Sequence, residues 1–276
     1  MLNTTDYEER LKQELLSRGF SHATFKTYAV GLNEFERFLK KELRYAKNDD
    51  FRDFKLFLRE KKFATKTINS YLAAVKFFYR NILGRKLAYL PGYKNAKKLP
   101  VVHSKDFIVE MIEKTENLKH KLLISLLYSS GLRVSEAIKL KLENIDIINK
   151  ECRIIAGKGN KDRVSILSHN FIALLPKYLL EYNLTSGYLF PSTKGHICAR
   201  TAEEVVKQAA ARIDKTRRVF CHSLRSSFAT HLLENNTPIN KISDLLGHAD
   251  IKTTQIYLNV NKKRFEGIRS PIDVVH

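Results

Sequence analysis

The sequence contains few cysteines and none of the patterns that usually bind a metal ion or a nucleotide phosphate. Its three cysteines, Cys152, Cys198 and Cys221, are odd in number and widely spaced, unlike zinc ligands. We interpret them as packed thiols. An HExxH motif, a Walker A loop and a clustered Asp/Glu set for two metals are also absent. A protein of this kind that acts on phosphate is expected to need no metal or other cofactor.

Long apolar segments are missing as well. No run approaches the roughly 20 apolar residues that a membrane-spanning helix requires, and residues 1–20 carry too many charges for a signal peptide. We therefore expect a soluble, cytoplasmic protein without a membrane partner.

Acidic residues are scarce relative to basic ones. The chain has 49 Lys and Arg against 29 Asp and Glu, which gives a formal net charge of +20. Such an excess favours binding to a polyanion, because each neutralised phosphate releases counterions. A basic surface that serves only solubility is the alternative, but a surplus of this size favours nucleic acid over an anionic membrane.

Apolar residues in the first ninety positions recur at steps of three and four, which predicts helices. Segment 21–41 carries one such stripe and segment 65–83 another, and both are expected to face a core. The stripes comprise Phe25, Tyr28, Leu32, Phe35 and Leu39, then Ile68, Leu72, Val75 and Tyr79. The opposite faces are basic, through Lys26, Arg37, Lys66, Lys76 and Arg80. A solvated face explains any one of them; as DNA contacts we select Lys26, Lys66, Lys76 and Arg80.

Helical periodicity stops between residues 90 and 106, where Pro91, Gly92 and Pro100 accompany several lysines. This composition is typical of a linker. We predict an N-terminal helical domain over residues 1–92, a linker over 93–104 and a second domain over 105–276.

The second domain mixes two periods. Residues 151–167 alternate on both sides of a Gly-Lys-Gly-Asn turn, which predicts a β-hairpin. Helical patterns return at 171–182, 202–213, 223–233, 239–246 and 253–260. The predicted fold is mostly α, with a small antiparallel β-sheet in the second domain.

Two short polar motifs are associated with this hairpin: the first precedes it in the sequence and the second forms its turn. In "SGLRVSE", Arg133 and Glu136 are three residues apart and share a helix face, either as a surface ion pair or as an arginine fork held toward a phosphate. In "GKGNKDR", Lys158 lies at the hairpin tip, either solvated or able to donate a proton to a leaving oxygen. Neither motif decides between its two interpretations.

Two more motifs lie near the C-terminus. "HSLR" places His222 and Arg225 on one helix face, while His231 falls near the opposite face and is interpreted as packing or surface. "LLGHADIKTTQIY" adds His248 and, nine residues later, Tyr257. Two arginines can neutralise a pentacoordinate phosphate, and a phenol can bond to phosphorus and later leave. The set is therefore suited to phosphodiester transfer.

These four motifs, in this order and spacing, resemble the tyrosine recombinases, the λ-integrase-like family, and most closely its compact Xer branch. The resemblance covers almost the whole chain and implies a two-domain, C-shaped clamp whose N-terminal part is a SAM-like core-binding domain. It implies that Tyr257 is the nucleophile, forming a 3′-phosphotyrosyl link, and that its short helix presents it to the phosphate rather than to the core.

The resemblance also implies roles for the other motif residues. Arg133 and Arg225 would clamp the scissile phosphate, and Glu136 would orient Arg133. Lys158 would act as general acid toward the 5′-oxygen. His222 would assist proton transfer, and His248 would bond a non-bridging oxygen.

By the same resemblance, the partner is double-stranded DNA and four protomers exchange strands without ATP or metal. The tail beyond Tyr257 would dock on a neighbouring subunit through Phe265, Ile268, Ile272 and Val274. The short chain lacks an added arm-binding domain, which favours Xer-like dimer resolution over integration of a mobile element. A type IB topoisomerase-like enzyme and a non-catalytic DNA-binding regulator stay open as alternatives, as does a need for an accessory protein.

Overall fold

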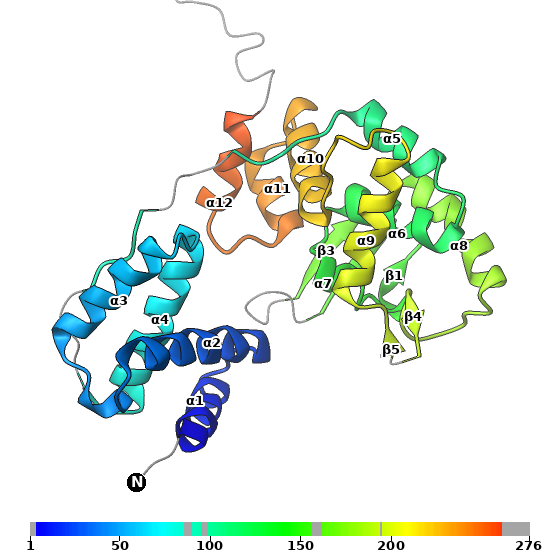
Figure 1. Cartoon of the computed structure of the whole chain (residues 1–276). Coiled ribbons are helices and arrows are strands. Elements are labelled where there is room, and N and C mark those ends of the chain that lie inside the picture. Colours follow the sequence, from blue (N-terminus) through cyan, green and yellow to red (C-terminus); the bar gives the residue numbers. More distant parts are fainter. Residues whose placement is uncertain (1–3, 86–89, 95–98, 156–161, 194, 261–276) are drawn as a thin grey trace, which may run out of the picture. The chain divides into compact units, whose positions relative to one another are not determined.

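The chain divides into two compact units, Met1–Lys97 and Lys98–His276. The computed structural model describes residues 4–85, 90–94, 99–155, 162–193 and 195–260 (Figure 1). Within these residues every helix is too short or too polar to cross a lipid bilayer.

The first unit is helical. It consists of α1 (Thr4–Ser17), α2 (His22–Leu39), the 3-10 turn η1 (Leu43–Tyr45), α3 (Asn48–Glu60) and α4 (Thr65–Asn81). Ser21 caps α2 by accepting a hydrogen bond from the Thr24 amide. The predicted helices over 21–41 and 65–83 therefore correspond to α2 and α4.

The predicted apolar stripes form the core of this unit. Leu32, Phe35 and Leu39 are buried, Phe25 and Tyr28 pack at its edge, and the stripe from Ile68 to Tyr79 is fully enclosed. Helices α2 and α4 approach closely at Gly31, where an added Cβ would lie 3.0 Å from the Tyr71 Cα. A glycine in mid-helix costs stability, and here it permits the close crossing.

The ends of the predicted linker are each held by a different unit. Tyr93 exchanges two backbone hydrogen bonds of 2.8 Å with the Asn69 side chain on α4. His103 is buried in the second unit, where its amide donates to Ser227 and its ring contacts Ser223.

The second unit begins with α5 (Lys105–Glu113), α6 (Leu118–Ser130), α7 (Val134–Ala137) and η2 (Leu142–Asn144). The strands β1 (Ile145–Asp146), β2 (Glu151–Ile154) and β3 (Arg163–Ile166) form an antiparallel sheet in the order β1-β2-β3. In the register of β2 and β3, Glu151 is paired with Ile166 and Ile154 with Arg163. The predicted hairpin strands are thus confirmed.

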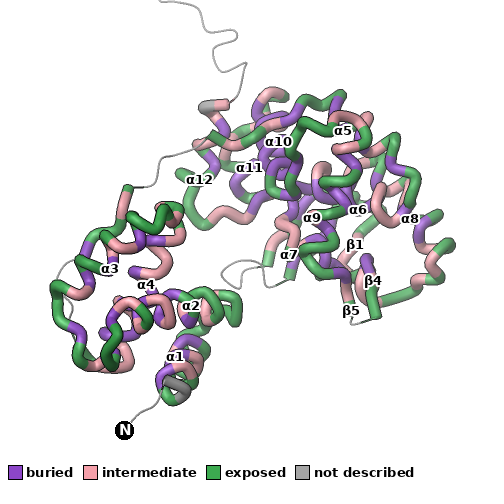
Figure 2. Tube along the Cα trace, in the orientation of Figure 1, coloured by how far each residue is buried: buried purple, intermediate pink, exposed green. Residues whose placement is uncertain are grey.

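The remaining elements surround this sheet and α6. They are α8 (His169–Glu181), the short pair β4 (Pro191–Ser192) and β5 (Gly195–His196), α9 (Ala199–Ala211), α10 (Cys221–Glu234), α11 (Ile239–Leu246), α12 (Lys252–Gln255) and η3 (Ile256–Asn259). Figure 2 shows buried residues concentrated along α6, α9 and α10. Helix α10 is buried on almost every side, and this central helix carries two of the predicted site residues.

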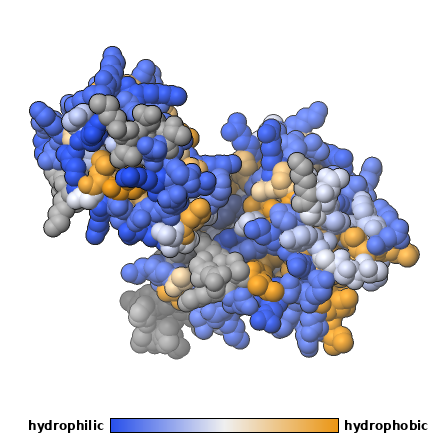
Figure 3. All heavy atoms as spheres, turned by 90° about the horizontal axis from the view of Figure 1, so that it is seen from below, coloured by the Kyte–Doolittle hydropathy of each residue, from blue (hydrophilic) through white to orange (hydrophobic). Residues whose placement is uncertain are grey.

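The surface is largely polar. On the face seen in Figure 3, hydrophilic residues predominate and apolar ones form small separate patches. One cysteine prediction is wrong: Cys152 and Cys221 are buried, but Cys198 is exposed. Its sulfur caps α9 by accepting a hydrogen bond from the Thr201 amide, a role that requires a position at the helix start.

Candidate active site

The described site residues come from separate elements of the second unit. Arg133 is the N-cap residue of α7, and Glu136 lies within that helix. His222 and Arg225 are on α10, and His248 follows the end of α11. Tyr257 is on η3. Lys158 and the tail residues Phe265, Ile268, Ile272 and Val274 lie outside the described residues.

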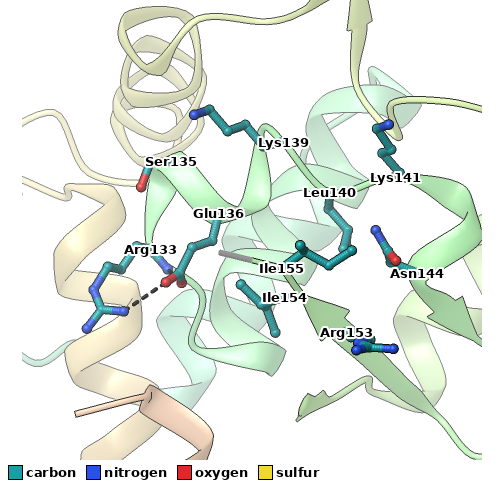
Figure 4. A pocket seen from close by; sticks show the side chains of 10 residues that line it. All are labelled: Arg133, Ser135, Glu136, Lys139, Leu140, Lys141, Asn144, Arg153, Ile154 and Ile155. Atoms are coloured by element: carbon teal, nitrogen blue, oxygen red, sulfur yellow. Dashed lines mark hydrogen bonds and ion pairs between the residues drawn. The ribbon is translucent and has the colours of Figure 1, made fainter. Parts of the chain in front are cut away.

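Glu136 is a buried hub rather than half of a surface ion pair. Its carboxylate is 6% exposed. It accepts hydrogen bonds of 2.8 Å from both the Arg133 amide and the Arg133 guanidinium, which Figure 4 shows facing it. Burial acts to raise the Glu136 pKa, but hydrogen bonds from Arg163 and Arg133 outweigh it and lower the pKa to about 2. The carboxylate is therefore ionised throughout the physiological range.

Sequence interpretation did not single out Arg163, although it ends the "GKGNKDR" motif. Its two Nη atoms donate to the two Glu136 oxygens at 2.8 and 2.7 Å, and its Nε donates to the Leu245 carbonyl at 3.0 Å. A lone arginine opening a strand gives no local signal of such contacts, because Glu136 and Leu245 are 27 and 82 residues away.

Arg225 is almost fully enclosed, at 1% exposed. Its guanidinium donates at 2.6 Å to the Gly131 carbonyl and at 2.6 Å to the Leu246 carbonyl. Burial, followed by repulsion from Arg133, lowers the Arg225 pKa to about 10, so the group stays protonated at neutral pH. A buried cation held by neutral carbonyls keeps most of its charge available to an anion.

His248 contacts this arginine directly. Its Nε2 lies 3.1 Å from an Arg225 Nη, and its Nδ1 lies 2.8 Å from the Thr254 hydroxyl. Since arginine can only donate, Nε2 accepts and Nδ1–H donates to Thr254, which assigns the tautomer. Burial is the largest cause that lowers the His248 pKa, and repulsion from Arg225, Arg133 and Arg163, with a smaller contribution from His222, brings it to about 4. The exposed His222 is thus within electrostatic reach of His248.

Tyr257 is buried, contrary to the prediction that its helix presents it away from the core. It is 4% exposed and packs with Phe228, Leu233, Ile242 and Leu246. These apolar neighbours come from α10 and from the middle and end of α11, and the two on α10 are more than 20 residues away in the sequence, so the residues next to Tyr257 do not predict them. Its phenol is near enough to Arg225 to act on that residue's pKa.

A hollow of about 520 Å³ adjoins Arg133 and Glu136 (Figure 4). Three further basic residues line it, Lys139, Lys141 and Arg153, beside apolar Leu140, Ile154 and Ile155. In the described part of the chain, no three His, Cys, Asp or Glu side chains gather in a set that could hold a metal ion.

Two of the basic residues predicted to contact DNA line one groove of the first unit. Lys26 and Lys66 border a shallow groove of about 610 Å³ between the starts of α2 and α4. Lys76 is half-buried and Arg80 is exposed on α4. The groove brings two of the four cations together, and their contact with DNA stays a prediction.

Mild acid should destabilise the second unit. Burial lowers the pKa of His103 and His231 below the ordinary value, and that of His248 falls to about 4. Between pH 6.5 and 4 the unfolded chain binds a proton at His248 and the folded chain does not, so the free energy of unfolding decreases as pH falls. The lowered pKa values of His103 and His231 act in the same direction. We expect His248 alone to contribute on the order of 1–2 kcal/mol after solvent screening.

Urea unfolding of wild type and His248→Gln at pH 7.5, 6, 5 and 4.5 measures this effect. From pH 7.5 to 4.5 the free energy of unfolding should decrease less in His248→Gln than in wild type. A free energy of unfolding that is constant in wild type from pH 7.5 to 4.5 would contradict the expectation.

Comparison with known proteins assigns the family. Residues 103–264, more than half of the chain, match the phage integrase family. The chain belongs to this family of tyrosine recombinases. Residues 8–89 of this tyrosine recombinase match the N-terminal SAM-like domain of phage integrases.

Relatives of the recombinase align over nearly its whole length. It is 32% identical to an integrase/recombinase of Sinorhizobium fredii, over 98% of this chain and 90% of that protein. It is 31% identical to the tyrosine recombinase XerD of Staphylococcus saprophyticus, over 94% and 95%. These relatives identify a tyrosine recombinase of the Xer type.

Solved structures share the fold. XerH, in a post-cleavage complex with a palindromic difH substrate, is 25% identical with a TM-score of 0.74, covering 96% of this chain and 83% of that one. XerA is 27% identical with a TM-score of 0.55, covering 94% and 96%. The predicted fold class, mostly α with a small antiparallel sheet, is confirmed.

Proposed function

We propose that this tyrosine recombinase cuts and rejoins DNA strands at specific sites through a 3′-phosphotyrosyl link to Tyr257. One observation carries the proposal: Arg133, Arg225 and His248 converge on the end of α11, with Tyr257 close to Arg225. Three groups able to bind phosphate oxygens thus adjoin a phenol able to attack phosphorus.

The strand cut proceeds as an in-line displacement. The Tyr257 oxygen bonds to phosphorus while the bond from phosphorus to the 5′-oxygen breaks, and Arg133 and Arg225 neutralise the charge on the non-bridging oxygens. His222 assists removal of the phenol proton, and Lys158 gives a proton to the departing 5′-oxygen. His248 binds a non-bridging oxygen. To donate from Nε2 it must take up a proton or exchange tautomer, because Nε2 now accepts from Arg225.

Rejoining reverses these steps with a 5′-hydroxyl of a second strand. The phosphotyrosyl bond conserves the energy of the phosphodiester, so the reaction requires neither ATP nor a metal ion. Basic residues of the hollow beside Arg133 and of the groove at Lys26 and Lys66 hold the flanking phosphates of double-stranded DNA.

Among recombination tasks we favour Xer-like resolution of chromosome or plasmid dimers by four protomers. The likeness to XerD over 94% of the chain supports this choice, and the XerH structure on its difH site supports DNA as the substrate. Integration of a mobile element uses the same chemistry and is the second candidate, supported by the integrase/recombinase relative.

Covalent trapping tests the proposal. The protein is mixed with nicked duplexes of varied sequence, quenched in detergent, and the DNA that stays attached is sequenced. We expect a protein–DNA adduct that maps to Tyr257 and a shared sequence among the recovered strands. A folded, DNA-binding protein that yields no adduct would favour a non-catalytic DNA-binding regulator.

A further inference from the structure

Arg163 makes a set of contacts that the proposed chemistry does not use. It is 10% exposed, and its guanidinium binds both oxygens of the buried Glu136 in a bidentate pair. Bidentate arginine–carboxylate pairs fix direction as well as charge. Arg133 donates to the same two oxygens, so Glu136 is shared between the two arginines.

The charges around Glu136 do not balance. Arg133 and Arg163 donate to it, and an Arg225 Nη lies 4.0 Å from its nearer oxygen. Three guanidinium groups face one carboxylate, which leaves a formal surplus of two positive charges. Since Arg163 occupies both carboxylate oxygens, Glu136 cannot turn fully toward Arg133 and Arg225. Their charge therefore stays available for a phosphate.

The three arginines also bind three consecutive carbonyls at the end of α11. Arg163 donates to Leu245 O at 3.0 Å, Arg225 to Leu246 O at 2.6 Å and Arg133 to Gly247 O at 3.2 Å. The last carbonyls of a helix have no partner within the helix and carry partial negative charge, so cations bind there. This carbonyl run immediately precedes His248.

Gly247 makes the close packing of Arg163 possible. Its φ is +62°, and an added Cβ would lie 2.6 Å from the Arg163 Cδ. The backbone next to His248 and the Arg163 side chain therefore fit against each other, and neither can shift independently.

We propose that Arg163 is a positioning residue of the active site. It fixes Glu136 and the end of α11, so that Arg133, Arg225 and His248 hold the geometry required by the scissile phosphate. Arg163 also opens β3, five residues after Lys158 in the sequence, so it anchors the strand that follows the proposed general acid. The role rests on the proposed strand-cutting function and involves no contact between Arg163 and DNA.

The test compares Arg163→Met with Arg217→Met. Arg217 forms an exposed ion pair with Asp214 in the same unit, so both variants lose one positive charge. Three quantities are measured: the single-turnover rate of adduct formation on a nicked duplex, the Kd for that duplex, and the thermal midpoint. We expect Arg163→Met to slow adduct formation about 100-fold, as for a small misplacement of reacting groups. Its Kd should stay within about threefold of the Arg217→Met value.

A double-variant cycle with Glu136→Gln shows whether Arg163 acts through that carboxylate. If it does, Arg163→Met/Glu136→Gln is no slower than the slower single variant. Arg163→Lys, which keeps the charge but loses the fork, should also be slow. Should the methionine variant not fold, Arg163→Lys is compared with Arg217→Lys instead, so that both variants keep the charge.

Each outcome decides the matter. Wild-type rates in the Arg163 variants, additive losses in the cycle, or parallel losses of rate, affinity and thermal midpoint would overturn the positioning role. A wild-type protein that binds DNA but forms no adduct would instead overturn the proposed function on which the role rests.

Discussion

Tyr257→Phe should abolish covalent attachment to DNA while leaving the fold and DNA affinity intact. The variant lacks the only atom through which the residue can bond to phosphorus, so adduct formation should fall at least 1,000-fold, to the detection limit. The ring remains, and with it the packing against Phe228 and Leu246. The Kd for a nicked duplex should stay within about threefold of wild type, because the flanking phosphate contacts supply most of the affinity.

The matched control is Tyr128→Phe. Tyr128 packs against the same apolar cluster, and its hydroxyl contacts His231 Nδ1 at 2.9 Å. Loss of that hydrogen bond should cost about 1 kcal/mol of stability, yet the variant should still form the adduct. Adduct formation by Tyr257→Phe at the wild-type rate would mean that another residue is the nucleophile.

Arg225→Lys should slow adduct formation by about 100- to 1,000-fold, the loss expected when a donor to a developing oxyanion is removed. An ammonium keeps the charge but cannot reproduce the planar fork that reaches Gly131 O, Leu246 O and His248 together. Because those buried carbonyls lose partners, the thermal midpoint should also fall by several degrees.

Single-turnover kinetics and thermal unfolding, with Arg217→Lys as the control, measure both effects. Arg217→Lys should leave rate and midpoint near wild type, since its ion pair is exposed. An Arg225→Lys variant that cuts at the wild-type rate would exclude this arginine from charge neutralisation at the phosphate.

Local patterns were sufficient for much of the fold. The apolar stripe from Phe25 to Leu39 predicted α2 because only one face of that helix packs on the core. The alternation of apolar and polar residues predicted β2 and β3 because successive side chains of a strand point to opposite faces of the sheet. The predicted helix over 239–246 coincides with α11. These elements could be predicted because the spacing of apolar residues along a short segment reflects the periodicity of the helix or strand that the segment forms.

The site was predicted less completely, because its contacts join distant segments. The contacts of Arg163 could not be predicted because Glu136 and Leu245 approach it only through the tertiary fold. The burial of Tyr257 was missed because its packing partner Phe228 belongs to another helix. A surface ion pair and a buried hub are likewise indistinguishable from the spacing of Arg133 and Glu136, since only tertiary packing removes the water around them.

The low exposure of Tyr257, 4%, has a consequence for the lifetime of a cut strand. A phosphotyrosyl ester open to solvent is exposed to hydrolysis, which would leave an unsealed strand break. An ester formed inside an apolar pocket meets little water. In the proposed reaction a DNA hydroxyl brought in with the partner strand is then the favoured acceptor, so the packing around Tyr257 would protect the covalent intermediate as well as stabilise the fold.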